Sequence, residues 1–281
     1  VGGYTVSCGK STYTVDSRGA LISWKWKKKE MLAGPLEPDF WKPANDNQIR
    51  NDYGRTMGAW KNAGMERETV NSEARIKILG YEWGLLLRLL TAKERRLKEL
   101  RFDFKLPVGG KLILCYSFSE KQVRVSEFYN PEESQIESMP RFGMRMKVPA
   151  QYDSVRWIGR GPWENYPDRK NGALSGKYAL SVSEYMVDYV YPQDNSNRSD
   201  CLDFILENNS LHTGKKKTLD KPKIHVSSIE PFNLRIWNYS EEDLEKARHG
   251  YELPHRDYLN INIDKEIIGV GGNDAWGART E

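Results

Sequence analysis

The stretch LRFDFKL, residues Leu100–Leu106, alternates apolar and polar side chains without interruption. Successive side chains of an extended strand point to opposite faces of a sheet, so this alternation predicts a β-strand. The same period of two recurs in KLILCYSF (Lys111–Phe118), QVRVSEF (Gln122–Phe128) and FGMRMKV (Phe142–Val148). Four such segments in close succession favour an antiparallel β protein.

The rest of the chain continues as short strand-like segments separated by Gly, Pro and Asn. YTVDSRGALISWKW predicts a hairpin, with strands at Tyr13–Val15 and Leu21–Trp26 and a turn at Asp16–Gly19. Short strands separated in this way predict an all-β fold, an antiparallel sandwich, and argue against a parallel α/β sheet. Further strands are expected at Ser154–Gly159, Ile224–Ile229, Leu234–Tyr239 and Tyr258–Ile263.

One segment predicts a short helix. In YSEEDLEKARH (Tyr239–His249), Ser240 is a suitable N-cap and Asp243 follows it by three residues. Leu244 and Ala247 then share one face of the helix.

Two segments have no clear period. LLLRLLTAKERRLKEL (Leu85–Leu100) fits a helix, or two strands joined at TAKERR, and we favour the strands. The Pro-rich region Gly34–Gly58 shows no periodicity over a length that is unusual for an inert loop, and such loops are lids, binding surfaces or disordered insertions.

Composition bounds the class of protein. With 281 residues, 38% apolar and 11% aromatic side chains, the chain can bury a sizeable core. The net charge of +4 is mildly basic and the lysines are mostly dispersed, so we expect no nucleic-acid partner. No apolar run reaches the ~20 residues that a membrane helix needs, so we expect no membrane span.

The sequence contains none of the local patterns of a metal or nucleophile site. Cys and His do not form CxxC, HxH or HExxH, and GxSxG and Walker motifs are missing. We therefore expect neither a disulfide framework nor a metal site. The cysteines are Cys8, Cys115 and Cys201, and the histidines are His212, His225, His249 and His255.

The C-terminal stretch IIGVGGNDAWGARTE (Ile267–Glu281) places Trp276 shortly after a glycine run. We expect no dinucleotide fingerprint, because Asp274 stands where the last glycine belongs and the sequence as given leaves no room for the following helix. The glycines permit a sharp turn after a strand, and Asn273 and Asp274 can fix it. Trp276 then either stacks on a sugar ring or covers the end of the sandwich.

A second polar and aromatic cluster is RWIGRGPWENYPDRKNG (Arg156–Gly172). Its composition fits a carbohydrate surface, and equally a buried ion-paired loop that locks the sandwich. Glu164 and Asp168 are a candidate pair of the kind that glycosidases use, but loop spacing does not establish their separation.

These motifs together resemble a known family. The cluster Arg156–Gly172, YVYPQDNSNRSD (Tyr189–Asp200) and the stretch Phe232–Gly277 resemble, in order, the C-terminal domain of family 2 glycoside hydrolases of the β-galactosidase type. DFWKPANDNQI (Asp39–Ile49) resembles the family's FWRAPxDND stretch, with Lys42 in place of Arg. The resemblance covers nearly the whole chain.

The resemblance implies a single domain over residues 1–281, a large two-sheet, galactose mutarotase-like supersandwich with one or two short helices. It implies a role as an accessory domain of a retaining β-galactosidase that cleaves terminal β-galactosides such as lactose. The catalytic glutamates and the magnesium and sodium ligands belong to a TIM barrel outside this chain, so no catalytic or metal residue and no cofactor is expected here. The expected partners are a β-galactoside and the other domains, above all the barrel, in a homo-oligomeric parent enzyme.

The resemblance also implies site residues. Trp276 would be an aromatic platform for the aglycone sugar, with Asn273 and Asp274 supporting its turn. Residues 45–57 resemble a mobile segment beside the same pocket. Further candidates for substrate binding are Asp46, Asn47, Glu164 and Asn165.

Three points stay open at this stage. A stand-alone carbohydrate-binding module and a mutarotase-like aldose epimerase are the alternatives, although no histidine lies in an epimerase motif. The family continues past the tryptophan motif with a closing strand, and we expect the sequence as given, which ends at Glu281, to lack that strand. The compartment, cytoplasmic or periplasmic, is undetermined.

Overall fold

The computed structural model describes residues 3–50, 52–78, 96–132, 134, 136, 138–208 and 222–271. These residues form mostly antiparallel strands with a few short helices, which confirms the all-β prediction. No helix among them is both long and apolar enough to cross a bilayer. The strands are β1 (Tyr4–Cys8), β2 (Ser11–Val15), β3 (Leu21–Trp26), β4 (Lys29–Glu30), β5 (Gly34–Asp39), β6 (Glu68–Ile78), β7 (Arg96–Lys105), β8 (Lys111–Phe118), β9 (Val123–Asn130), β10 (Arg141–Pro149), β11 (Ser154–Gly161), β12 (Leu174–Ser181), β13 (Arg198–Glu207), β14 (Ile224–Trp237) and β15 (Tyr258–Ile267). The helices are α1 (Asp46–Arg50), α2 (Tyr53–Met57), α4 (Val182–Tyr185), α5 (Glu241–Lys246) and the 3-10 turns Gly58–Trp60 and Gly250–Glu252.

The chain divides into two compact units, each described here by itself. Unit 1 comprises Val1–Met31 and Met65–Ile136, and unit 2 comprises Leu32–Gly64 and Glu137–Glu281. The expectation of a single domain over residues 1–281 stays a prediction.

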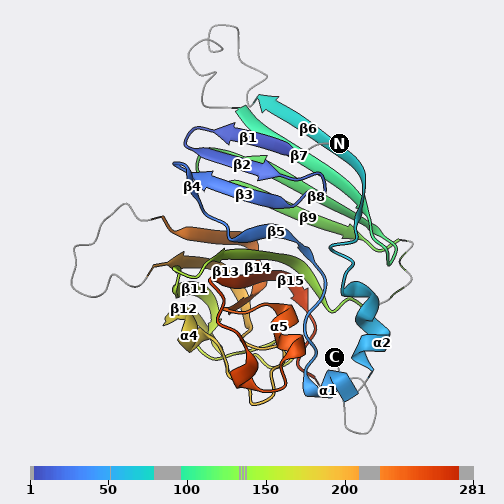
Figure 1. Ribbon diagram of the computed structural model, residues 1–281, viewed down its shortest axis with the longest axis vertical. Coiled ribbons are helices and arrows are strands. Elements are labelled where there is room, and N and C mark those ends of the chain that lie inside the picture. The colour runs from blue at the N-terminus through green and yellow to red at the C-terminus, as the bar shows by residue number, and fades with distance from the viewer. Residues whose placement is uncertain are drawn as a thin grey trace, which may run out of the picture. The chain divides into compact units, whose positions relative to one another are not determined.

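Unit 1 is a sandwich of two layers (Figure 1). One layer has the strand order β1-β2-β3, with β4 paired to β3, and the other has the order β6-β7-β8-β9. Aromatic side chains join the layers: the ring centroids of Tyr13 and Phe118 are 5.0 Å apart, and the Tyr116 hydroxyl donates to the Gly19 carbonyl at 2.7 Å. The layers therefore share one core.

The period of two seen in the sequence matches this core. Leu100, Phe102 and Phe104 on β7 are buried, as are the alternate residues of β8 from Leu112 to Phe118. The hairpin β2–β3 is also confirmed. At its turn Gly19 has a φ of +73°, and a Cβ there would collide with the Phe104 ring.

Unit 2 contains one antiparallel sheet segment with the order β5-β10-β15-β14-β13-β11-β12 (Figure 1). Apolar residues of its central strands, such as Leu234, Ile236 and Ile261, are fully or almost fully buried. The prediction of two strands at 224–229 and 234–239 was wrong, because β14 runs continuously through Pro231. The pairing of β14 with β13 shifts register there, and proline is tolerated where the ladder is interrupted.

The predicted helix is confirmed as α5. The Ser240 hydroxyl accepts from the Asp243 amide at 3.1 Å, and the Asp243 carboxylate accepts from the Ser240 amide at 2.9 Å. This reciprocal capping box satisfies two amides that a helix start otherwise leaves unpaired. The Pro-rich region resolves into β5, α1 and α2. Of the stretch Leu85–Leu100, residues 96–100 lie in β7 and the others lie outside the described residues.

Candidate functional site

The glycine-rich stretch after β15 is held from one side by Asp168. Its carboxylate accepts from the backbone amides of Val270, at 3.2 Å, and Gly271, at 3.0 Å. Asp168 comes from the loop after β11, about 100 residues earlier in the chain. The sequence-predicted clusters at 156–172 and 267–281 therefore meet in the fold.

From the other side, three side-chain amides hold the carbonyls of the same stretch. Gln48 donates to the Gly269 carbonyl at 3.3 Å, Asn45 donates to the Val270 carbonyl, and Asn47 donates to the Gly271 carbonyl at 3.0 Å. We call Asn45, Asn47, Gln48 and Asp168 the backbone clamp. The clamp engages the carbonyls of residues 269–271 and the amides of Val270 and Gly271, so little local freedom remains to this stretch.

The clamp amides are positioned by the start of helix α1. The Asn45 side chain accepts from the Gln48 amide at 2.9 Å, and the Gln48 side chain accepts from the Asn45 amide at 3.1 Å. This is the reciprocal bonding of a capping box, which fixes both side chains. The sequence PANDNQ thus forms a short helix start that presents amide N–H groups.

The glycine at position 269 is explained by the clamp. A Cβ on Gly269 would collide with the carboxylate of Asp168. Gly271 has a φ of +100°, a conformation that favours glycine. Gly269 thus allows the close approach of the Asp168 carboxylate, and Gly271 allows the backbone to turn.

The three residues predicted at the tip, Asn273, Asp274 and Trp276, lie outside the described residues, which end at 271. Their roles as turn supports and platform stay predictions. What the structure adds is the firm attachment of the backbone that leads to them.

Glu164 and Asn165 tie loops together. The Glu164 carboxylate, 8% exposed, accepts from the Tyr189 hydroxyl at 2.8 Å, from Arg169 at 2.5 Å and from the Ser196 amide at 2.5 Å. Asn165 is buried and its side chain accepts from the Ser199 amide at 2.9 Å. These bonds agree with the interpretation of the cluster as a buried, ion-paired loop. A role of either residue in substrate binding stays a prediction.

The other candidates differ in exposure. Asp46 and Asn47 are exposed at the start of α1, and the Asp46 amide donates to the Gln193 side chain at 3.2 Å. The Asp168 carboxylate accepts from backbone amides, and the Glu164 carboxylate accepts from Arg169, Tyr189 and Ser196. A role of the two as a carboxylate pair stays a hypothesis.

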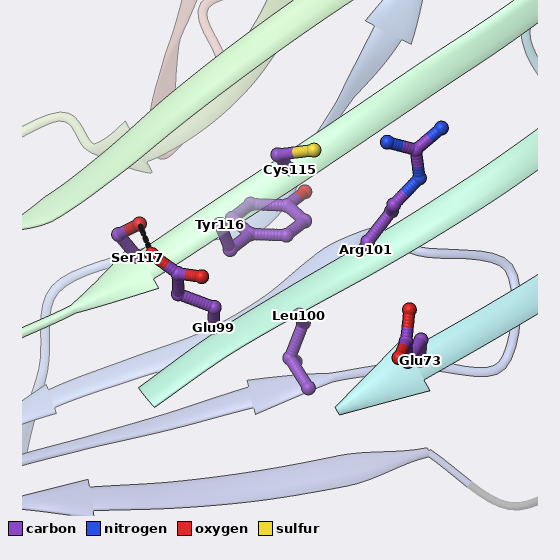
Figure 2. A pocket seen from close by; sticks show the side chains of 7 residues that line it. All are labelled: Glu73, Glu99, Leu100, Arg101, Cys115, Tyr116 and Ser117. Atoms are coloured by element: carbon purple, nitrogen blue, oxygen red, sulfur yellow. Dashed lines mark hydrogen bonds between the residues drawn. The ribbon is translucent and has the colours of Figure 1, made fainter. Parts of the chain in front are cut away.

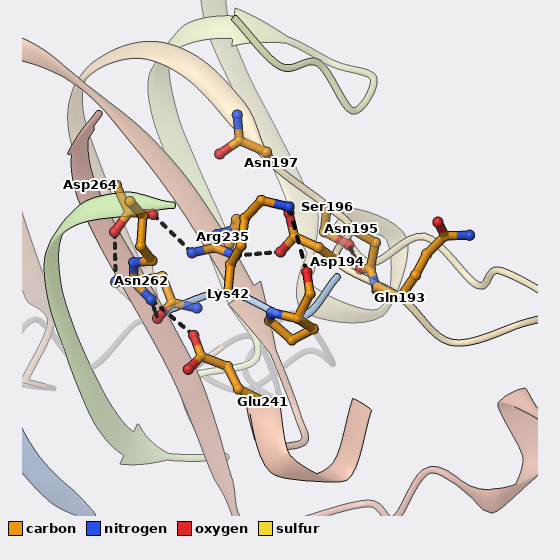
Figure 3. Close-up of polar contacts among 12 residues, drawn as sticks. Lys42, Gln193, Asp194, Asn195, Ser196, Asn197, Arg235, Glu241, Asn262 and Asp264 are labelled. Carbon is orange, nitrogen blue, oxygen red and sulfur yellow. Dashed lines mark hydrogen bonds and ion pairs between the residues drawn. The ribbon is translucent and has the colours of Figure 1, made fainter. Parts of the chain in front are cut away.

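Behind the clamp lies a chain of buried charges (Figure 3). Lys42 pairs with Asp194 at 3.5 Å, and Arg235 on β14 bonds both Asp194 and, at 3.0 Å, Asp264 on β15. Asp264 also pairs with Arg141 of β10 at 2.6 Å. All five side chains are fully buried, so their charges are compensated by one another and not by water.

The charges in this chain shift the pKa values of its carboxyl groups. Burial alone would raise the pKa of Asp194, but Arg235 and Lys42 outweigh burial and hold that pKa below its usual value. At the other end, burial and the neighbouring Asp39 raise the pKa of Glu241 well above its usual value. Arg141, Arg145 and Arg235 lower this pKa, but burial and Asp39 outweigh them. The partners of Arg141 and Arg145 are Glu37, Asp39, Glu241, Glu242 and Asp264.

Comparison with known proteins now decides the family. Residues 7–281 match the family described as β-galactosidase small chain. The chain belongs to the β-galactosidase small-chain family. The β-galactosidase of Halalkalibacterium halodurans is 30% identical over 92% of this chain, and that of Priestia megaterium is 27% identical over 98%. The chain spans 24% of the length of each of these relatives.

The buried charges were not predicted from the sequence. On β15 the apolar residues Leu259 and Ile261 alternate with Asn260, Asn262 and Asp264, and both faces of the strand are buried there. Alternation alone suggests a solvent-facing polar side. The repeated Asn and Asp, which are poor strand formers, were the available signal.

Unit 1 also has a pocket lined mainly by polar residues of β6, β7 and β8 (Figure 2). The Arg101 side chain in it pairs with Asp103 at 2.8 Å, and the Ser117 hydroxyl donates to Glu99 at 3.5 Å. None of the sequence-predicted site residues lines it. The lining residues are Glu73, Glu99, Leu100, Arg101, Cys115, Tyr116 and Ser117. Within the described part of the chain, no three His, Cys, Asp or Glu residues are grouped as metal ligands.

Proposed function

We propose that this chain is the accessory C-terminal domain of a retaining family 2 β-galactosidase. In this role it forms the aglycone side of the active-site pocket, and Trp276 stacks on the leaving-group sugar. Two facts support the proposal: the chain belongs to the small-chain family, and it spans about a quarter of β-galactosidase relatives. The single observation that carries the role is the backbone clamp on residues 269–271.

The clamp matters because a glycine-rich segment has the largest conformational freedom to lose. Ordering one residue costs roughly 1–2 kcal/mol in backbone entropy. The clamp orders the residues that lead to Trp276 before any ligand arrives, so sugar binding does not bear that cost. Such preorganisation suits a flat indole ring that must meet the C–H face of a sugar.

The chemical step is assigned to the rest of the enzyme. A retaining glycosidase needs two positioned carboxyl groups, one acid and one nucleophile. Near the clamp the carboxylates of Glu164 and Asp168 are occupied by protein partners. We propose that the catalytic glutamates and the magnesium and sodium ions belong to the barrel of the parent enzyme, and that this chain alone is inactive.

The platform is tested by Trp276→Ala in the complete enzyme. Loss of one aromatic contact is expected to weaken aglycone binding and transfer to a sugar acceptor by roughly 1–3 kcal/mol. Trp163→Ala is the matched control, because it removes a tryptophan of the same unit that is 75% exposed. Unchanged acceptor kinetics in Trp276→Ala would refute the platform.

The accessory role is tested on the isolated chain. Calorimetric titration with lactose is expected to give millimolar affinity or none, because much of the pocket lies elsewhere. Tight binding would instead identify a stand-alone carbohydrate-binding module. Hydrolysis of a chromogenic galactoside by the isolated chain would contradict the assignment of the chemistry to the barrel.

A further inference from the structure

Lys42 is a fully buried lysine within the unit that carries the clamp. Its ammonium donates to the Gln48 side-chain oxygen at 2.8 Å and to the Pro43 carbonyl at 3.5 Å. It also pairs with Asp194 at 3.5 Å (Figure 3). Lysine is almost never fully buried unless it is paired, because its charge loses hydration. A shorter or apolar side chain would fill the core at a lower desolvation cost. The buried charge therefore suggests that the ammonium group of Lys42 has a function beyond packing.

The contact with Gln48 gives Lys42 a direct connection to the clamp. An ammonium group only donates hydrogen bonds, so the oxygen end of the Gln48 amide must face it. The backbone amide of Asn45 donates to the same Gln48 oxygen at 3.1 Å. The NH2 end of Gln48 is thereby directed to the Gly269 carbonyl, 3.3 Å away.

On its other side Lys42 joins the buried chain of charges. Asp194 also accepts from the Tyr166 hydroxyl at 2.9 Å and bonds Arg235, and Arg235 bonds Asp264. Arg235 and Asp264 belong to the central strands β14 and β15. Ion pairs in a dry interior hold a defined geometry, because any displacement leaves a charge uncompensated.

We propose that Lys42 is a positioning residue for the sugar platform: it connects the ionic core of strands β14 and β15 through Gln48 to the backbone that carries Trp276. This inference rests on the proposed function. Lys42 does not touch substrate in this scheme. Through Gln48 it fixes the position of the Gly269 carbonyl, at the start of the stretch that leads to Trp276. Loss of Lys42 is therefore expected to weaken acceptor binding more than cleavage of the glycosidic bond.

The test uses the complete β-galactosidase and measures how the galactosyl group divides between water and added glucose, with 2-nitrophenyl β-galactoside as donor. Lys42→Met is expected to lower transfer to glucose relative to hydrolysis by about two- to tenfold, the effect of one lost positioning hydrogen bond. Lys42→Arg keeps the charge and the hydrogen-bond donors, so this variant is expected to retain most of the transfer to glucose that the unsubstituted enzyme shows. Ser181→Ala, which weakens the cap of α4 outside these ion pairs, is the control for general destabilisation and should leave the division unchanged.

Lys42→Met can fail to fold, and Gln48→Glu covers that case. A carboxylate at position 48 keeps a partner for Lys42 but loses the donor to Gly269 and repels its carbonyl. The same fall in transfer is expected from Gln48→Glu. Unchanged transfer in Gln48→Glu, or in a folded Lys42→Met, overturns the inference.

Trp276→Ala separates this inference from the proposed function on which it rests. If that variant leaves transfer unchanged, the platform itself is wrong, whatever Lys42 does. If Trp276→Ala lowers transfer and neither Lys42→Met nor Gln48→Glu does, the platform stands and the positioning role of Lys42 is overturned.

Discussion

Gly269→Ala and Asp168→Ala are expected to weaken the clamp by similar amounts, and the double variant no more than either one. The Asp168 carboxylate accepts two backbone hydrogen bonds, at 3.2 and 3.0 Å. Both are solvent-exposed, so we take the lower net value of about 1 kcal/mol each, or about 2 kcal/mol for Asp168→Ala. A Cβ at position 269 collides with that carboxylate and displaces it, which loses the same two bonds.

Amide hydrogen exchange of Val270 and Gly271 is the suitable assay, because the clamp can open without global unfolding. A loss of about 2 kcal/mol corresponds to roughly 30-fold faster exchange in each single variant. In the double variant the carboxylate is already gone, so exchange should again be roughly 30-fold faster and not about 1000-fold. Gly172→Ala is the matched control, since its Cβ meets no atom within 4 Å. Independent effects that multiply in the double variant would refute the collision, and full protection in Asp168→Ala would refute the clamp.

Two further predictions concern charge and capping in unit 2. The pKa of Glu241 is raised by burial and by Asp39, so its contribution to stability is full below the unfolded pKa of about 4.3 and is lost as pH rises toward the folded value. The glutamine of Glu241→Gln cannot ionise. In chemical denaturation the free energy of unfolding of the variant should therefore rise relative to that of the unsubstituted protein between about pH 4 and pH 7. A constant difference in the free energy of unfolding across that range would contradict the raised pKa. Ser240→Ala removes the acceptor for the Asp243 amide and should lower the free energy of unfolding by about 1 kcal/mol in urea denaturation. No measurable loss would show that the cap does not stabilise α5.

Strands with one buried face were predictable from the sequence. LRFDFKL and KLILCYSF alternate because one face of β7 and β8 packs against the other layer of unit 1. The cap of α5 was predictable too, since a capping box depends on residues three apart. Strand β6 (Glu68–Ile78) and strand β13 (Arg198–Glu207) were missed, because polar residues interrupt their alternation.

The candidate site was found in separate pieces. The sequence pointed to three sets of residues, but no periodicity relates them. They are Asp46 and Asn47, Glu164 and Asn165, and Asn273, Asp274 and Trp276. The bonds of the clamp join Asn47 to Gly271 and Asp168 to Val270, across 224 and 102 residues of chain. Lys42 and Gln48 were not identified as site residues, because their contacts exist only after the strands have paired.

Local order in this protein follows from neighbouring residues: the period of its strands, the turn at Gly19 and the cap at Ser240 can each be read along the chain. Burial of charge cannot, because it depends on which distant segments cover a face. Asn260, Asn262 and Asp264 have the pattern of a solvent-facing row, yet folding encloses them with Arg141, Arg235 and residues from remote loops. Tertiary packing alone converts that polar row into an ionic core, and it brings the Asp168 carboxylate so close to Gly269 that a Cβ there would displace it.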